Sequence, residues 1–276
     1  MDSGPKPRLF IGTAGYSYAD WVGPIYPPGT KTAGYLPHYA RLFPLGELNF
    51  SYYRMPTAHA LAAIHDKAPN VQWCVKAHQS MTHDRSAGLT EFLQFRESLE
   101  PLLAPSRLFA CLFQFPTSFH RSPVALDWLR QCREWLPDLP VVVEFRGRDW
   151  IDTEAVLPLL RELDLAWCAV DEPDLPALMP PLAAATASLG YIRFHGRNAA
   201  KWWKHDHAYE RYDYLYTAAE LADWIPRIAR LLEKTGTVGV VFNNHYRGQS
   251  VENARMLAEL LPAELHQHLV APSTME

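Results

Sequence analysis

The chain has 276 residues, a formal net charge of -4 at pH 7 and 48% hydrophobic residues. This balance is normal for a globular protein with a sizeable core, and the length lies near the roughly 250 residues of an eight-stranded α/β barrel. The charge provides no global basic field, so it disfavours nucleic acid as a partner. No stretch approaches the roughly 20 apolar residues that span a bilayer, so we expect a cytoplasmic protein with no membrane partner.

Short runs of β-forming residues recur along the chain with helical stretches between them. This alternation is typical of parallel strands joined by crossover helices. The eight runs are residues 9–13, 47–52, 71–77, 108–115, 141–145, 166–171, 191–195 and 238–243. Thr217 followed by Glu220 forms a capping-box pattern at one helix start. We predict an α/β fold, a single (β/α)8 TIM barrel over residues 1–276, with residues 1–7 and 271–276 flexible.

Two motifs that would favour other classes of protein are missing. A Rossmann fold needs a Gly-x-Gly-x-x-Gly turn after an early strand, whereas the turn at residues 12–16 reads GTAGY. The four cysteines, Cys74, Cys111, Cys132 and Cys168, include no Cys-x-x-Cys pair, which predicts reduced and mostly buried thiols.

The predicted strands have two chemically different faces, because side chains two apart along a strand share a face. One face is apolar and suited to packing under helices: Leu48, Phe50, Val75, Phe113, Phe115, Val143, Phe145, Ile192, Phe194, Val240 and Phe242. The other face is polar: Glu47, Asn49, Lys76, His78, Gln114, Glu144, Arg146, Asp171, Arg193, His195, Asn243 and His245. These polar residues lie near the carboxyl ends of the strands, where TIM barrels form their active sites. The alternative is a set of buried ion pairs that only closes the barrel.

Several roles remain open for these residues. Glu144 is a candidate general base, because apolar surroundings raise the pKa of a carboxyl group, or it forms a salt bridge to Lys76 or Arg193. Lys76 is a candidate for a Schiff base. We favour it as an electrostatic clamp for an anion, because nearby Glu47 and Glu144 would keep it protonated.

A divalent metal is a second hypothesis. His195, Asp171, Glu144 and His245 offer nitrogen and oxygen ligands from separate strand ends, although the sequence has no His-Glu-x-x-His element. Other residues after the seventh and eighth strands favour an anion such as phosphate or carboxylate: Arg193, Gly196, Arg197, Asn243, Asn244 and Gly248.

Two long loops, residues 14–30 and 197–216, are rich in aromatic residues. Loops of this length are often functional, so Tyr16 and Trp21 are candidate ligand contacts, although aromatic residues also anchor loops to a barrel. The strip Lys201, Trp202, Trp203 and Lys204 has the basic and aromatic character of a surface that stacks single-stranded nucleic acid. The strip is short, so it alone does not outweigh the negative net charge.

Specific stretches of the chain resemble the YecE-like family, catalogued as domain of unknown function 72. The matching segments are residues 11–18 with Trp21, then 47–56, 75–78, 112–116, 143–146 with Asp149 and Trp150, 191–196 and 242–244. The resemblance covers nearly the whole chain and implies a barrel, but the family name implies no reaction. The chain departs from the expected pattern at residues 197–207, a basic insertion that contains tryptophan.

The leading hypothesis is an enzyme, a hydrolase, lyase or isomerase, that uses acid/base chemistry on a small anionic substrate, phosphorylated or carboxylated. The alternatives are a metal-dependent phosphoesterase or nuclease, and a non-catalytic ligand- or partner-binding barrel. The candidate catalytic residues are Glu144, Lys76, His195, Asp171 and Glu47. The candidate binding residues are Asn49, His78, Gln114, Arg146, Arg193, Arg197, Asn243, Asn244, Tyr16 and Trp21.

Overall fold

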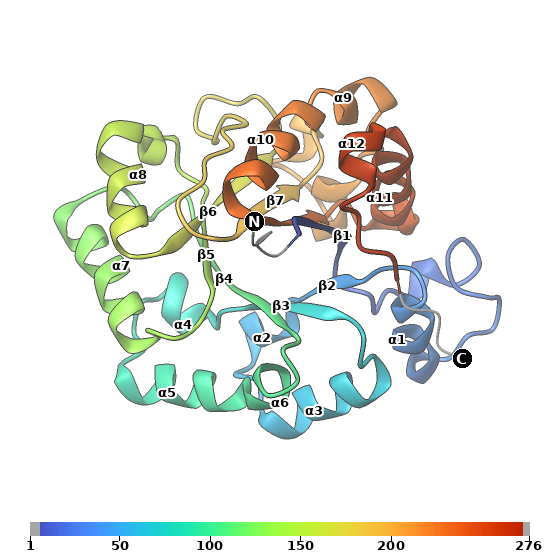
Figure 1. The fold of residues 1–276 in the computed structure, drawn as a ribbon, viewed down its shortest axis with the longest axis horizontal. Coiled ribbons are helices and arrows are strands. Elements are labelled where there is room, and N and C mark those ends of the chain that lie inside the picture. Colours follow the sequence, from blue (N-terminus) through green and yellow to red (C-terminus); the bar gives the residue numbers. More distant parts are fainter. Residues whose placement is uncertain (1–5, 273–276) are drawn as a thin grey trace, which may run out of the picture.

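The computed structural model describes residues 6–272 and contains a closed barrel of parallel strands that pair in chain order from β1 to β8. The strands are β1 Arg8–Ala14, β2 Leu45–Leu48, β3 Gln72–Lys76, β4 Leu108–Phe115, β5 Val141–Phe145, β6 Leu165–Asp171, β7 Gly190–Phe194 and β8 Thr237–Phe242. Helices surround this ring of strands (Figure 1). The predicted (β/α)8 TIM barrel is confirmed. Residues 1–5 and 273–276, expected to be flexible, lie outside the described residues, and the single-domain assignment stays a prediction.

Helices fill the connections between most strands. They are α1 Thr32–Ala40, α2 Phe50–Tyr53, α3 Ala58–Lys67, α4 Gln79–Thr82, α5 Leu89–Ser98, α6 Glu100–Leu103, α7 Pro123–Trp135, α8 Thr153–Glu162, α9 Ala218–Ala222, α10 Ile225–Thr235, α11 Gln249–Leu260 and α12 Ala263–His266. The predicted capping box is confirmed at α9, where Thr217 and Glu220 satisfy each other's backbone N–H groups. The connection from β6 to β7, residues 172–189, is described throughout and contains no helix.

The second strand differs from the prediction of residues 47–52. The observed β2 ends at Leu48, and the chain then turns into α2. The hydroxyl of Ser51 donates to the carbonyl oxygens of Leu48 and Lys76, which ties this turn to the end of β3. Phe50 was expected to pack under the helices, but it lies in α2 with 40% of its surface exposed. The run of aromatic residues has high β propensity, and this local preference misled the assignment.

The other residues of the predicted apolar face are buried, as expected for that face. Within the barrel, small and large residues complement one another. A Cβ atom on Gly239 would lie 2.5 Å from the Phe109 ring, and Phe109 packs edge-on against Phe10 at 5.3 Å between ring centres. The four cysteines are buried and unpaired.

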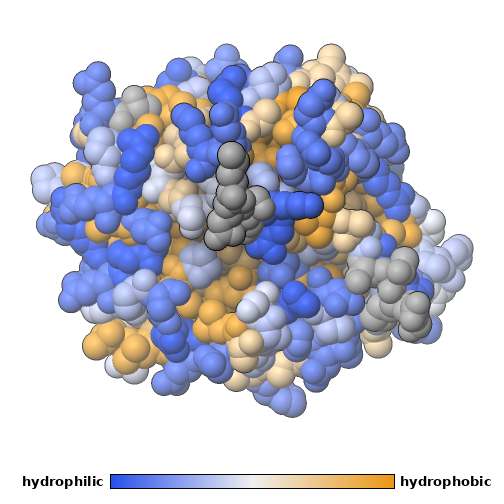
Figure 2. Space-filling model, in the orientation of Figure 1, coloured by the Kyte–Doolittle hydropathy of each residue, from blue (hydrophilic) through white to orange (hydrophobic). Residues whose placement is uncertain are grey.

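Hydrophilic side chains cover most of the face shown in Figure 2, with smaller hydrophobic areas between them. Among residues 6–272, no helix combines the length and the apolar character needed to cross a membrane.

Candidate functional site

Polar residues from the inner face of the barrel converge on a cavity of about 300 Å³ at the carboxyl ends of the strands. Parallel strands that pair in order bring these ends to one side of the barrel, so residues far apart in the sequence meet there. The lining residues are Tyr18, Asn49, Tyr52, Tyr53, Lys76, Gln114, Arg146, Arg193, Tyr212, Asn243 and His245. Three of them are cationic, and none is an aspartate or a glutamate.

The two central carboxylates lie beneath the cavity and are held by Arg193 of β7. The Nε and Nη2 atoms of Arg193 donate to the two carboxylate oxygens of Glu47 at 2.9 and 2.6 Å. Its Nη1 atom donates to Glu144 at 2.6 Å, so one guanidinium connects β2, β5 and β7. The hydroxyl of Tyr191 also donates to Glu47 at 3.1 Å. All four side chains are buried, and their ionic and polar partners compensate for the lost hydration.

Arg146 provides a second cation to the same group. Its Nε lies 2.6 Å from Glu144, and its Nη1 donates to Glu172 at 3.0 Å. Burial raises the pKa of Glu144, but the charges of Arg193 and Arg146 outweigh that effect and hold the pKa well below its usual range. The raised pKa that the general-base alternative needs is therefore absent at Glu144, whereas the alternative salt bridge to Arg193 is present. Burial raises the pKa of Glu172, which the sequence analysis did not consider, to about 7.

His195 lies beside Glu144 with no exposed surface. The side-chain amide of Asn243 donates to Nδ1 of His195 at 3.0 Å, which leaves the ring proton on Nε2. Nε2 faces Glu144 at 3.2 Å, but poor alignment prevents a hydrogen bond. Burial and the charge of Arg146 lower the pKa of His195 to about 3, so the ring is neutral near pH 7. His195 does not line the cavity, so it can act on a ligand only through its neighbours Glu144 and Asn243.

Lys76, at the end of β3, places its amine in the cavity. Nζ donates to the side-chain oxygen of Gln114 at 2.9 Å and lies 4.5 Å from the centre of the Tyr52 ring. No aspartate or glutamate in the described part of the chain forms an ion pair with it, because the nearby acids are paired with arginines. Burial and the charge of Arg193 lower the pKa of Lys76 to about 8. Glu144 and Glu47 oppose this shift, so Lys76 stays mostly protonated at pH 7, as expected, although its pKa lies below the ordinary value.

Asp171 does not share the inner face, contrary to the alternation predicted for it. Cys168 lies inside the barrel, 3.8 Å from Glu144, so Asp171, three residues later, points outward. Its carboxylate accepts hydrogen bonds from Arg197, Tyr216 and Trp224. Arg197 is consequently committed to Asp171 and to Glu220, away from the cavity.

Four other candidate binding residues also lie outside the cavity lining. His78 caps α4 through Ser80, and Asn244 donates to the Tyr214 carbonyl oxygen and to Asn253. Tyr16 packs against Tyr39 and Trp73, and buried Trp21 donates to the carbonyl oxygen of His245. These aromatic residues anchor the loop of residues 14–30.

Each long loop contributes one aromatic residue to the cavity lining, Tyr18 or Tyr212. Tyr18 stacks on His245 with 4.4 Å between ring centres. Tyr52 and Tyr53 belong to the family-like segment of residues 47–56, but they were not predicted to line the cavity. The predicted strand over residues 47–52 took the place of the turn into α2 that directs both tyrosines to the cavity. A polar Ser between aromatic residues next to a strand end was the available signal.

The basic insertion forms part of an adjoining cavity of about 260 Å³ that shares Gln114, Arg146 and Tyr212 with the first one. Trp202 is buried, with the Arg146 and Arg211 guanidiniums 5.9 and 5.4 Å from its ring centre. Trp203 also lines this cavity, and 53% of its surface is exposed. The strip therefore offers one accessible tryptophan to a ligand instead of two.

The proposed metal ligands do not converge. Asp171 points outward, His245 stacks on Tyr18, and Glu144 is occupied by two arginines. Within residues 6–272, no group of three or more His, Cys, Asp or Glu side chains is arranged to hold a metal ion. The residues present do not fit a divalent metal, and we derive no chemistry through one.

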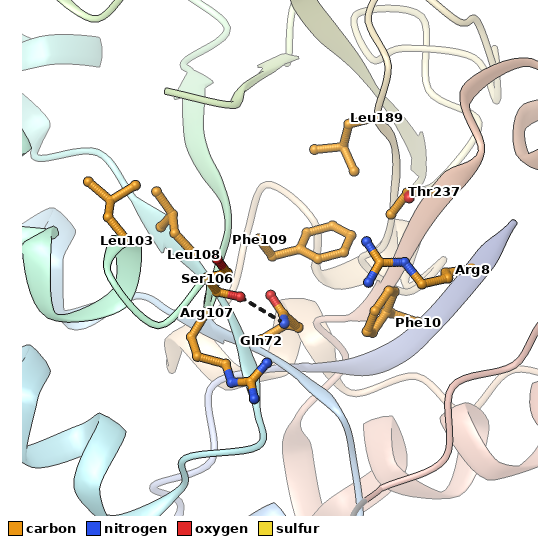
Figure 3. Close-up of a pocket in the computed structure, with 10 residues that line it drawn as sticks. All are labelled: Arg8, Phe10, Gln72, Leu103, Ser106, Arg107, Leu108, Phe109, Leu189 and Thr237. Atoms are coloured by element: carbon orange, nitrogen blue, oxygen red, sulfur yellow. Dashed lines mark hydrogen bonds between the residues drawn. The ribbon is translucent and has the colours of Figure 1, made fainter. Parts of the chain in front are cut away.

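A larger cavity of about 450 Å³ lies at the opposite end of the barrel, where Arg8, Gln72 and Thr237 begin their strands (Figure 3). Gln72 donates to the carbonyl oxygen of Ser106 at 3.1 Å, and Arg107 donates to that of Pro69. Its lining includes no acid, histidine or lysine that could exchange a proton near neutral pH. Residues at this end of a TIM barrel commonly support stability, so the smaller cavity is the better functional candidate.

Comparison with known proteins is consistent with this architecture. The model of the family described as "Protein of unknown function DUF72" matches residues 10–276. The chain belongs to the DUF72 family. It is similar to the UPF0759 protein YunF of Bacillus subtilis, with 32% identity over 93% of this chain and 95% of that protein. The narrower YecE-like grouping stays a prediction.

Two crystal structures of DUF72 family proteins share the fold. The Thermotoga maritima structure has a TM-score of 0.84 and 34% identity, covering 92% of this chain and 98% of its own. The Enterococcus faecalis structure has a TM-score of 0.82 and 27% identity, covering 92% and 95%.

Proposed function

We propose that the cavity at the strand ends binds a small anionic molecule, carboxylated or phosphorylated, and that Lys76 exchanges a proton with it. The observation that carries this proposal is the composition of the lining, in which three cationic side chains and three amides meet without an acid. Guanidinium and ammonium groups in a recess bind carboxylate and phosphate oxygens through charge-assisted hydrogen bonds.

Lys76 replaces Glu144 as the acid/base group in this proposal. A proton-transfer group works best with a pKa near the working pH, and the pKa of Lys76 is about 8. Glu144 and His195 are buried beneath the cavity, so we assign them the role of positioning Arg193 and Arg146. Proton transfer by Lys76 suits an enzyme that acts on an acidic C–H bond or on a leaving group.

Anion binding is tested with inorganic phosphate and malonate, measured by thermal shift and by titration calorimetry. Binding to the folded protein raises the melting temperature with ligand concentration. We expect Lys76→Met to lose at least about tenfold in affinity, because it removes a cation of the cavity. Its matched control is Lys67→Met in the last turn of α3, where the lysine is exposed and remote from the cavity.

Equal affinity in the wild type and both variants would locate the anion elsewhere and overturn the proposal. No binding of either anion to the wild type would also overturn it. Circular dichroism checks that Lys76→Met folds, which we expect because no ion pair of the described residues includes Lys76.

A further inference from the structure

Lys76 is the amine of the cavity, and its contacts fix its position without occupying it fully. Nζ has one hydrogen bond, to Gln114, and it lies over the face of the Tyr52 ring. An ammonium group has three donors, so further partners on Nζ are left to a ligand or to water. The lining position of Lys76 makes Nζ accessible from the cavity.

Burial, together with the charges of Arg193 and Arg146, shifts Lys76 toward the neutral amine. Arg193 and Arg146 line the same cavity, and the carboxylates near them are already paired with these two guanidiniums. A lysine in a desolvated pocket beside other cations is activated as a nucleophile, because the neutral form carries the lone pair. At a pKa of about 8, about half of the amine is neutral at pH 8.

The same cavity offers the partners that a small oxo acid requires. Arg146 lines the cavity with 11% of its side chain exposed, and Asn49 and Asn243 add amide groups. In a 2-oxo acid, the carbonyl carbon is bonded directly to the carboxylate carbon. A carboxylate bound by Arg146 would therefore place the carbonyl carbon in the same cavity as the Lys76 amine. A volume of about 300 Å³ restricts the ligand to a small molecule.

We propose that Lys76 forms a Schiff base with the carbonyl carbon of a small oxo acid whose carboxylate is held by the arginines of the cavity. This proposal rests on the proposed function, because it uses the same anion site. In the reaction, Nζ attacks the carbonyl carbon and forms a carbinolamine. The carbonyl oxygen then leaves as water with the two hydrogens of the neutral amine, and a C=N bond replaces C=O. No oxidant or reductant is consumed.

The test is reductive trapping with sodium cyanoborohydride and either glyoxylate or pyruvate as the probe. Intact mass spectrometry measures the adduct, and peptide mapping locates it. We expect one adduct per chain in the wild type, on Lys76, formed at least tenfold faster than on any other lysine. Lys67→Met retains the adduct. Lys76→Arg loses it, because arginine keeps the charge but forms no imine under these conditions.

The dependence of trapping on pH gives a second readout. The trapping rate at Lys76 should rise toward a plateau above pH 8, whereas an exposed lysine needs a pH near its ordinary pKa of 10.5. The titratable and charged groups that face Lys76 are Glu47 of β2, Tyr52 of α2, His83 beyond α4, Glu144 of β5, Arg146 just after β5, and Arg193 of β7. A profile that matches the unfolded chain would overturn the proposal.

The outcomes separate this proposal from the proposed function. Phosphate binding that persists in Lys76→Arg, together with selective trapping in the wild type, supports both. Phosphate binding without selective trapping overturns the Schiff base alone and leaves anion binding intact. Trapping that is spread evenly over many lysines also overturns the Schiff base alone. Neither binding nor trapping overturns both.

Discussion

At the scale of the residue, Arg193 determines how the acids beneath the cavity behave. It pairs with Glu47 and shares Glu144 with Arg146, so neither carboxylate forms an ion pair with Lys76. The site therefore has a buried layer of paired charges and, above it, a layer of cations and amides that faces the cavity. The lower layer positions Arg193 and Arg146, while the low pKa of Lys76 comes first from burial and then from the charge of Arg193.

Removal of Arg193 should be costly to stability. Arg193→Met leaves two buried carboxylates without their principal cation, and we expect it to lower the free energy of unfolding by about 3–5 kcal/mol. Urea unfolding measures the change. The control is Arg130→Met, which removes an exposed ion pair to Asp127 and should cost less than about 1 kcal/mol. Equal losses would show that the buried charges contribute no more than surface ones.

His195 should make the protein less stable in acid. Its folded-state pKa of about 3 lies below the ordinary value of 6.5, so protons bind first to the unfolded chain as the pH falls. The stability it contributes is present above pH 6.5 and is lost as the pH falls toward 3, on the order of 2 kcal/mol at pH 5. Urea unfolding at pH 7 and pH 5 should show a smaller pH effect in His195→Gln than in the wild type. His59→Gln, on the exposed side of α3, should leave the effect unchanged.

The alternation of side chains was enough to predict most of the inner face. Lys76, Gln114 and Arg193 could be placed on it because they lie at or next to the ends of their strands, beyond the register shift between β3 and β4. The parity failed at Asp171, because the interior positions of β6 are occupied by Cys168 and its even-numbered neighbours. The inward side chains of β6 are nonpolar while those of its neighbours are polar, and the sequence alone does not indicate this difference. The ion pair between Glu144 and Arg193 could be named only as one alternative, because pairing between charges depends on three-dimensional distances.

At the scale of the element, the loop of residues 197–216 is fastened at both ends. Asp171 receives hydrogen bonds from Arg197 at the start of the loop and from Tyr216 at its end. Gly196 has a positive φ of 90°, and a side chain there would collide with Tyr214, so the turn out of β7 depends on glycine. The fastened loop carries Tyr212 to the cavity.

Asp171→Asn should loosen this loop without unfolding the barrel. The neutral amide cannot serve as an ionic partner of Arg197, and a lost charged hydrogen bond corresponds to roughly 1.5–3 kcal/mol. We expect backbone hydrogen exchange in residues 197–216 to become at least about tenfold faster, measured by mass spectrometry. Asp206→Asn, an exposed change in the same loop, is the control. Unchanged exchange in Asp171→Asn would mean that the aromatic contacts alone hold the loop.

Sequence predicted the two long loops but could not divide their aromatic residues into anchors and ligand contacts. Trp21 and Trp202 are buried, whereas Tyr18 and Tyr212 reach the cavity. All four have the same amphipathic chemistry, so only the folded geometry separates them. The early end of β2 was missed for a related reason, because the Ser51 contact with β3 outweighs the strand preference of its aromatic neighbours.

At the scale of the whole molecule, the two ends of the barrel differ in chemistry. The cavity at the carboxyl end is lined by a lysine, two arginines and three amides. The cavity at the amino end has two arginines, one amide and no lysine, and Phe10 and Phe109 pack beside Gly239 there. Eight runs in the expected order and a fitting length made the barrel predictable, and β4 and β5 have the predicted bounds. Ligand chemistry was less predictable, because it depends on which charges remain unpaired after closure.

Substitution at the amino end of the barrel should lower stability without changing the cavity at the carboxyl end. Gly239→Ala forces a methyl group against Phe109, and overpacking of this kind costs about 1–3 kcal/mol. We expect lower thermal stability with unchanged phosphate affinity. Gly88→Ala is the matched control, since its added Cβ meets only a Glu91 oxygen, at 3.6 Å. A loss of phosphate affinity in folded Gly239→Ala would show that the two ends are coupled.

The charged centre also bears on how the chain assembles during synthesis. Glu47 and Glu144 emerge from the ribosome before Arg193, which follows them by 146 and 49 residues. A nascent chain that ends after β6 has both acids but lacks Arg193, the cation that they share. Excluding water from its interior would bury Glu47 without that cation. Such a partial barrel should stay hydrated and open until β7 arrives. Arg193 thereby couples the exclusion of water from the interior to completion of the chain.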